Sequence, residues 1–175
     1  MTTQRWPTAW LLTDERIGAE IDAAMQRAAE AGAGILVRHY RSSTAERRGL
    51  AERVQSLGAP LGIAGDCALA RELGAALVHR PDRTPCDLPF SMAVHDELEA
   101  AHAARSGAAL VFVSPVYPTR SHPGAPALGI DRAAALARCS GVRAIALGGV
   151  IEANAPALLQ RGFSGWAGID CWLRT

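Results

Sequence analysis

Gly148 and Gly149 are the clearest candidates for chemistry, because paired glycines after a buried strand can expose backbone N–H groups to a ligand. They lie in the segment ALGGVIEAN, residues 146–154, directly after an apolar run. A helix that begins near Asn154 would add the positive end of its dipole. Backbone donors next to a helix start are suited to binding a phosphate group. The same glycines could also serve only to allow a tight packing turn.

A second candidate is the polar loop SPVYPTRSH, residues 114–122, which follows the apolar run LVFV. The loop supplies hydroxyl groups from Thr119 and Ser121 and an imidazole from His122. An imidazole in a phosphate-binding loop suits phosphate contact or general acid–base catalysis. Simple solvent exposure is the alternative for His122.

Both candidates follow runs that have the composition of buried strands, and the same pattern repeats along the chain. We predict eight strands, over residues 9–13, 34–40, 60–64, 76–80, 90–95, 110–113, 142–147 and 165–169. We predict six helices between them, over residues 19–31, 44–57, 67–73, 96–106, 131–139 and 153–160. Alternating strands and helices indicate a parallel α/β fold, in which ligands bind at the carboxyl ends of the strands.

The simplest architecture is a single compact (β/α)8 TIM barrel that spans residues 1–175. The three prolines in residues 79–89 exclude a regular helix after the fourth strand, and only five residues follow the eighth. Two missing helices explain why 175 residues suffice, where such barrels usually need about 250. Trp166, Trp172 or a second copy of the chain would then cover the exposed strand faces, the last as a homodimer.

The composition restricts the classes of function. A net charge of +1 gives no reason to expect nucleic acid as a partner, and we expect no membrane span, no signal peptide and a cytoplasmic location. All 18 basic residues are arginines, so a Schiff-base lysine is excluded. The four cysteines form no C-x-x-C pair, and we expect ordinary thiols rather than a zinc site or a disulfide framework.

The loop at 114–122 resembles the GPVFPTxTK loop of thiamine-phosphate synthases, and residues 146–154 resemble the AIGGIxxxN turn of the same family. Shorter likenesses extend over residues 9–172. They include LTD at 12–14, GAALVH at 74–79 and DLP at 87–89. The order and spacing of the two main motifs identify the superfamily, which also includes the thiazole tautomerases.

The resemblance implies an enzyme of thiamine biosynthesis. It would transfer a pyrimidine methyl group from its diphosphate to a thiazole phosphate and release pyrophosphate, with Mg²⁺ as cofactor. The residues implied fall into three groups. Arg38 and His122 would hold the diphosphate as catalytic residues, and Asp66 and Asp87 would hold Mg²⁺. Substrate binding would involve Arg41, Thr119, Ser121, Gly148, Gly149 and Asp170.

This chain departs from the family pattern mainly on the diphosphate side. Leu36 stands where the family has glutamine, Tyr40 and His122 where it has lysines, and Ala93 where it has serine. The family's asparagine and metal-binding aspartate fall on residues 64–65, next to Asp66. On the thiazole side, Asp170 replaces a serine, and a carboxylate there would repel phosphate unless it points away or holds a metal.

Two other functions fit the sequence. A thiazole tautomerase would need a thiazole-phosphate site and one acid–base group, with His122 or His95 in place of the histidine expected at Pro115. A non-catalytic barrel that binds a phosphorylated ligand or a protein would explain the lost polar groups. Structural roles are also open: an ion pair for Arg38, helix capping for Asp66, strand-end packing for His79 and His95.

Overall fold

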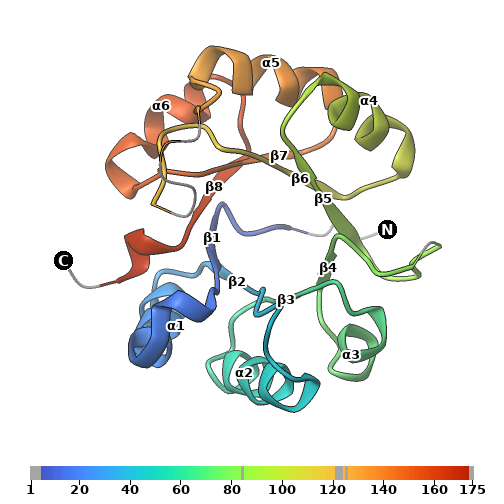
Figure 1. Ribbon diagram of the computed structural model, residues 1–175, viewed down its shortest axis with the longest axis vertical. Coiled ribbons are helices and arrows are strands. Elements are labelled where there is room, and N and C mark those ends of the chain that lie inside the picture. Colours follow the sequence, from blue (N-terminus) through green and yellow to red (C-terminus); the bar gives the residue numbers. More distant parts are fainter. Residues whose placement is uncertain (1–4, 84, 121–123, 125, 174–175) are drawn as a thin grey trace.

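Eight parallel strands close into a barrel in sequence order, as the sequence predicted (Figure 1). The computed structural model describes residues 5–83, 85–120, 124 and 126–173. The strands are β1 (Ala9–Leu12), β2 (Gly34–Val37), β3 (Leu61–Ala64), β4 (Leu77–His79), β5 (Phe90–Val94), β6 (Leu110–Val113), β7 (Ala144–Leu147) and β8 (Gly165–Gly168). Each pairs with the next, and β8 pairs with β1.

Helices surround the barrel. They are α1 (Ile21–Glu30), α2 (Thr44–Ser56), α3 (Cys67–Glu72), α4 (Glu97–Ser106), α5 (Ile130–Ser140) and α6 (Ala155–Gln160). Of these, α2, α3 and α4 begin at residues whose side chains cap them. Three 3₁₀ turns are η1 (Glu15–Glu20), η2 (Glu152–Asn154) and η3 (Asp170–Trp172). Ser43 and Glu46 form a capping box at α2, and Asp96 caps α4. Gly107 and Gly141 end α4 and α5 in the left-handed conformation.

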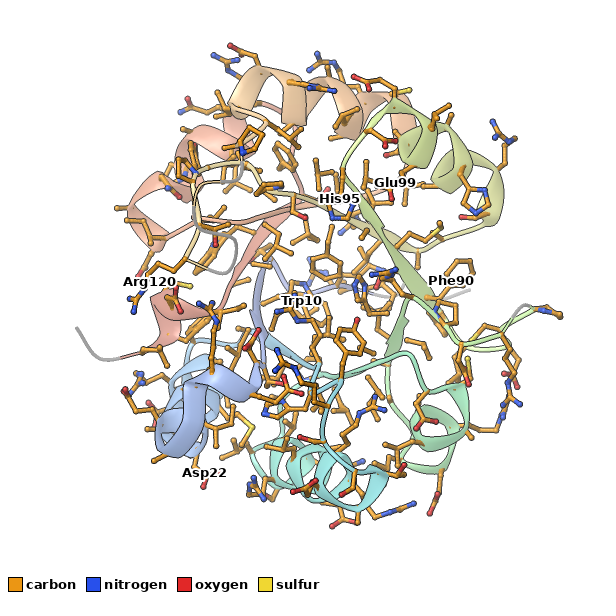
Figure 2. All side chains as sticks on the ribbon, in the orientation of Figure 1. Trp10, Asp22, Phe90, His95, Glu99 and Arg120 are labelled. Atoms are coloured by element: carbon orange, nitrogen blue, oxygen red, sulfur yellow. The ribbon has the colours of Figure 1, made fainter. Side chains whose placement is uncertain are left out.

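The barrel interior is filled by large side chains that face small ones. Trp10 lies near the centre of the ring of strands (Figure 2), and its ring occupies the space above Gly34, where an added Cβ would lie 2.6 Å from the indole. The edge of Phe112 meets Trp10 at 6.1 Å between ring centroids and His79 at 5.2 Å. All three side chains are buried, so the barrel is a packed core that closes the site from below.

The described part of residues 80–89, which we call the β4–β5 segment, contains no helix, as predicted. It runs along the outside between α3 and α4 (Figure 1). The backbone N–H of Cys67 donates to Asp82 at 3.0 Å, and Arg71 forms an ion pair with Asp87. Polar contacts to α3 therefore hold this segment in the place of a helix.

Only the turn η3 follows β8 within the described residues, and it folds back over the barrel wall. Trp172 stacks on Trp166, with centroids 5.5 Å apart and planes 7° from parallel. The Trp172 indole donates to the carbonyl of Trp10 at 3.2 Å, and Arg27 of α1 donates to the carbonyl of Trp172 at 2.7 Å. This pair of tryptophans covers the wall where a helix is missing. Within the described ranges, no helix has the length and apolar character needed to cross a membrane.

Candidate active site

A cavity of about 660 Å³ opens at the carboxyl ends of the strands, where the barrel fold places its ligands. Its floor includes Leu12, His79, Phe112 and Leu147. We call the wall formed by Thr119, Gly148, Gly149 and Val150 the glycine side, and the wall formed by Arg16, Arg38 and Arg80 the arginine side. Arg120 and Asp170 lie on the lining between them. A pocket with an apolar floor and two polar walls suits a small phosphorylated ligand.

On the glycine side, Gly148 and Gly149 have left-handed backbones, with φ of +93° and +64°. A Cβ at Gly148 would lie 2.8 Å from Pro115, and one at Gly149 would lie 2.4 Å from the carbonyl oxygen of Pro118. The loop after β6 therefore packs directly on this turn, and both glycines are required for packing. The packing role and the ligand role expected from the sequence are compatible, because they use different atoms.

The N–H groups of Gly148, Gly149 and Val150 donate to no acceptor in the part of the chain that the structure describes. All three residues line the cavity, so these donors are available to an anion. Asn154 supports the turn, since it donates to the carbonyl of Gly149 at 3.3 Å and accepts from the N–H of Ile151 at 3.0 Å. The helix α6 behind it has only six residues, so its dipole adds less than the sequence suggested.

Thr119 lines the same wall. The other two predicted residues of this loop, Ser121 and His122, lie outside the described residues, and their predicted roles stay predictions. Arg120, which precedes them, lies on the side of the molecule near the C-terminal segment (Figure 2).

Arg38 extends from the end of β2 into the arginine side of the cavity. Its backbone N–H donates to Thr13 at 3.0 Å, and its guanidinium forms a 2.8 Å ion pair with Asp14. Asp14 also lies 3.5 Å from Arg16. The ion pair that the sequence left open as a structural role for Arg38 therefore exists, and Arg38 also lines the cavity.

Asp170 continues this chain of charges across the cavity rim. Its carboxylate lies 3.1 Å from Arg16 and 3.9 Å from Arg120. Because two guanidinium groups offset its charge, Asp170 is compatible with a nearby phosphate. The sequence left that question open.

Three other predicted residues lie away from the cavity lining. Arg41 donates its backbone N–H to Glu15 at 2.7 Å. Asp66 caps α3 by accepting from the N–H of Leu69 at 2.9 Å and pairs with Arg47 at 3.6 Å. Asp87 pairs with Arg71 on the outer surface. The structure does not bring Asp66 and Asp87 to the cavity lining.

The predicted Mg²⁺ ligands consequently do not fit a metal site here. Both carboxylates are held by arginines, and among the described residues no group of three or more histidine, cysteine or acidic side chains gathers around one point. A Mg²⁺ site needs oxygen ligands in near-octahedral geometry.

His79, at the carboxyl end of β4, is buried on the cavity floor and its Nδ1 lies 3.0 Å from the hydroxyl of Ser91. Burial, and then the positive charges of Arg38, Arg80 and His95, lower the pKa of His79 to about 3. The imidazole is therefore neutral at pH 7 and contributes packing and a hydrogen bond, as the structural alternative for His79 proposed.

His95 also lines the cavity. Its Nδ1 lies 2.7 Å from the carboxylate of Glu99, which also accepts from the His95 backbone N–H at 2.7 Å. The two side chains lie beside each other in Figure 2. An imidazole oriented by a carboxylate can take up and return a proton.

Sequence reasoning missed Arg16, Arg80 and Asp14, all of which shape the arginine side. Arg80 was recoverable, because it is the last residue of a predicted strand and such positions point toward the site in this fold. Arg16 lies in the turn η1 and Asp14 directly precedes it. The sequence pattern did not predict η1 as an element distinct from α1.

A protein-family model described as thiamine monophosphate synthase matches residues 9–171 of this chain. The chain belongs to this family. The resemblance drawn from the loop at 114–122 and the turn at 146–154 is therefore confirmed.

Curated relatives carry the name thiamine-phosphate synthase. The protein from Azoarcus sp. is 35% identical over 131 residues, which are 67% of this chain and 62% of that protein. The protein from Chloroflexus aurantiacus is 28% identical over 151 residues, 77% of this chain and 70% of that protein. The chain thus spans less than two thirds of the Azoarcus relative.

Solved structures agree on the fold. A thiamine phosphate pyrophosphorylase from Pyrococcus furiosus matches with a TM-score of 0.76 at 20% identity, over 93% of this chain and 85% of that one. FabK from Thermotoga maritima matches with a TM-score of 0.75 at 14% identity, over 97% of this chain and 63% of that one. At these identities the likeness shows the barrel fold alone.

Proposed function

We propose that this chain is a thiamine-phosphate synthase-like transferase. It would move a pyrimidine methyl group from its diphosphate to a thiazole phosphate and release pyrophosphate. One observation carries this proposal beyond family membership. A single cavity has unengaged backbone donors on one wall and guanidinium groups on the other. Two substrates that each carry phosphate need two such anion-binding walls.

The glycine side is suited to the thiazole phosphate. The N–H groups of Gly148, Gly149 and Val150 would donate to its oxygens, and Thr119 lies on the same wall. Ser121 and Asp170 complete this proposed subsite, Asp170 by holding Arg16 and Arg120 at the rim. Backbone donors are fixed before the ligand arrives, so little reorganisation is needed on binding.

The arginine side is suited to the diphosphate. Arg38, with His122 as its proposed partner from the opposite loop, would offset the negative charge that grows as the bond from the methylene carbon to the diphosphate oxygen breaks. The thiazole nitrogen would then form the new bond to that carbon. The floor of Leu12, Phe112 and Leu147 excludes water from the carbocation-like centre.

A requirement for Mg²⁺, which the family resemblance implies, stays a proposal for this chain. The roles proposed from sequence for Asp66, Asp87 and Arg41 have no support from the cavity lining.

A second candidate function is thiazole tautomerisation, and the His95–Glu99 pair favours it. An isomerase of this kind needs one group that removes and returns a proton next to a bound thiazole phosphate. His95 lines the cavity and is oriented by Glu99 at 2.7 Å. This reaction would use the glycine side and leave the arginine side without a role.

Steady-state kinetics with both substrates, with and without Mg²⁺, test the proposal. We expect thiamine phosphate and pyrophosphate to form in equal amounts, with a high KM for the pyrimidine diphosphate because both family lysines are absent. Isomerisation of the thiazole substrate without coupling, abolished in His95→Gln, would instead establish the tautomerase. If neither reaction is detected, the remaining candidate is a non-catalytic barrel that binds a phosphorylated ligand.

The expectations for cellular location and oligomeric state also stay proposals. We propose a cytoplasmic location, which fits a biosynthetic enzyme of this family. We also propose a homodimer through the wall next to the β4–β5 segment, where exposed Leu98 begins the neighbouring helix face. Sedimentation at micromolar concentration tests the second, with Leu98→Asp as the variant that should remain monomeric.

A further inference from the structure

Arg80 has the most unusual backbone among the described residues. It follows β4 directly, and it is the one described residue other than glycine with a positive φ, at +49°. Its N–H donates to the carbonyl of Ser91 at 2.8 Å, which fixes the chain at this point. A side chain in the left-handed region is unfavourable, and such strain is concentrated where a side chain has a functional position to hold.

The charge of Arg80 also differs from that of the other cavity arginines. Arg16, Arg38 and Arg120 each pair with Asp14 or Asp170, whereas Arg80 forms no ion pair within the described part of the chain. Its positive charge is therefore uncompensated, and it faces the cavity next to Arg38 and the neutral His79.

We propose that Arg80 binds the diphosphate group. It would supply positive charge in place of the two lysines that the family resemblance implies at the positions of Tyr40 and His122. This inference rests on the proposed function, because it assigns a residue to the leaving group of that reaction. A guanidinium presents several N–H donors in a rigid fork and can hold two phosphate oxygens at once. The strained backbone keeps this fork directed over the arginine side.

Arg80→Gly is the sharpest test, because glycine adopts a positive φ without strain. The probe is inorganic pyrophosphate, titrated calorimetrically into the free protein, with thiazole phosphate as the second ligand. We expect Arg80→Gly to weaken pyrophosphate binding at least tenfold, to change thiazole phosphate binding less than twofold, and to keep or raise Tm. Arg80→Lys should recover part of the affinity. Arg83→Ala, an exposed arginine of the same segment, is the matched control and should bind like wild type.

Equal pyrophosphate affinity in wild type and Arg80→Gly would overturn the role of Arg80 and leave the proposed function intact. A loss of affinity together with a lower Tm would also overturn it, since the residue would then be structural. Pyrophosphate binding that depends on Arg80 in a protein without synthase turnover would support the role and refute the proposed function.

An independent observation concerns Cys67 and Cys86, whose sulfur atoms lie 3.4 Å apart. Cys67 is the first residue of α3 and is buried, and Cys86 lies half-buried on the β4–β5 segment. Disulfide bonding needs the two sulfurs to approach to about 2.05 Å. The contact between α3 and the β4–β5 segment already holds the two sulfur atoms within van der Waals contact of each other. The spacing of the cysteines in the sequence did not indicate this pair.

The geometry points to Cys67–Cys86 as a site of reversible oxidation by a small disulfide such as oxidised glutathione. The more accessible Cys86 thiolate attacks the small disulfide, forms a mixed disulfide and releases one small thiolate. The Cys67 sulfur, after losing its proton, attacks the Cys86 sulfur and releases the second. Two protein thiols are oxidised and one small disulfide is reduced to two thiols.

Peptide mass mapping after treatment with oxidised glutathione tests this pair. We expect one intramolecular link that joins the peptides of Cys67 and Cys86, forms equally in Cys139→Ser, and disappears with a reductant. Cys86→Ser should leave Cys67 reduced, because Cys67 is buried. A stable glutathione adduct on Cys86 with Cys67 still free, or a link that involves the exposed Cys139 instead, would overturn the assignment.

Discussion

The glycine side and the arginine side of the cavity offer two different means of binding an anion. The glycine side offers backbone N–H groups of a turn whose conformation is fixed by packing against residues 115–118. The arginine side offers long side chains that follow β2 and β4 or lie in the turn η1, and two of them, Arg38 and Arg16, are held by ion pairs with Asp14 and Asp170. A site built from backbone depends on a few glycines at fixed positions, whereas a site built from side chains can be rebuilt from other strand ends.

This difference explains why the departures from the family motifs fall mainly on the arginine side. Changing a glycine in the turn would displace the neighbouring loop, so its positions cannot move. Under the role proposed for Arg80, the cation for the diphosphate comes from the residue after β4 instead of a lysine at position 40, since both positions line the same cavity. Loss of a motif residue on the arginine side therefore does not by itself indicate loss of function.

The largest effect should come from breaking the glycine side with Gly149→Ala. The new Cβ would lie 2.4 Å from the carbonyl oxygen of Pro118 at a backbone with φ of +64°. We expect the free energy of unfolding to fall by about 3 kcal/mol, from strain and overpacking together. Urea denaturation measures this.

Gly58→Ala is the control, since its φ of +68° is similar and no atom lies within 4 Å of an added Cβ. It should cost only the conformational part, about 1 kcal/mol. Equal losses in the two variants would mean that the loop at 115–118 does not pack on the turn as described.

Arg38→Ala should break the arginine side. Loss of one cationic contact in the transition state lowers the rate about hundredfold, which is equivalent to about 2.7 kcal/mol. We expect this fall in kcat/KM for the pyrimidine diphosphate, with thiazole phosphate affinity changed less than threefold. Steady-state kinetics and calorimetry check the two halves of the prediction. A similar loss for both substrates would show that the two sides do not bind separate ligands.

The floor between the two sides should make stability depend on pH. The pKa of His79 is about 3 in the folded protein, because of burial and nearby positive charges, and about 6.5 when unfolded. The unfolded state therefore binds more protons between these values, and stability falls as pH drops below about 6.5. At pH 5 the loss should be about 2 kcal/mol relative to pH 8. In His79→Gln this part of the pH dependence should disappear; an unchanged profile would mean that the imidazole is protonated in the fold.

The smallest effect should come from Asp170→Ser, which restores the residue that the family resemblance implies. Removing this carboxylate removes repulsion toward phosphate and releases Arg16 and Arg120 from their shared partner. We expect thiazole phosphate to bind about threefold more tightly at low salt, where such pairs count most. Asp131→Ser, an exposed partner of Arg161, is the control. Weaker binding in Asp170→Ser would show that the carboxylate is needed to hold Arg16 in place.

The barrel was predictable from sequence because most strands are apolar runs separated by helical stretches, several of which end at a glycine. The Gly148-Gly149 turn was predictable as part of the strand-end site, and it does line the cavity, while phosphate binding there stays a prediction. The metal ligands were not: a carboxylate after a strand, such as Asp66, can equally cap the next helix, and this one does so. Arg16 and Asp14 were missed because their position depends on the path of η1, which only the folded chain specifies.

The stacked tryptophans also give the protein a spectroscopic property. Two indoles 5.5 Å apart and nearly parallel couple their electronic transitions, so they should produce paired bands of opposite sign in circular dichroism. Trp166 lies in β8, whose last residue Gly168 lines the cavity, and Trp172 belongs to the turn that begins at Asp170. Detachment of that turn would abolish the coupled bands while the remaining strands stay paired. The loss of this signal would therefore report opening at the C-terminal end before the barrel itself unfolds.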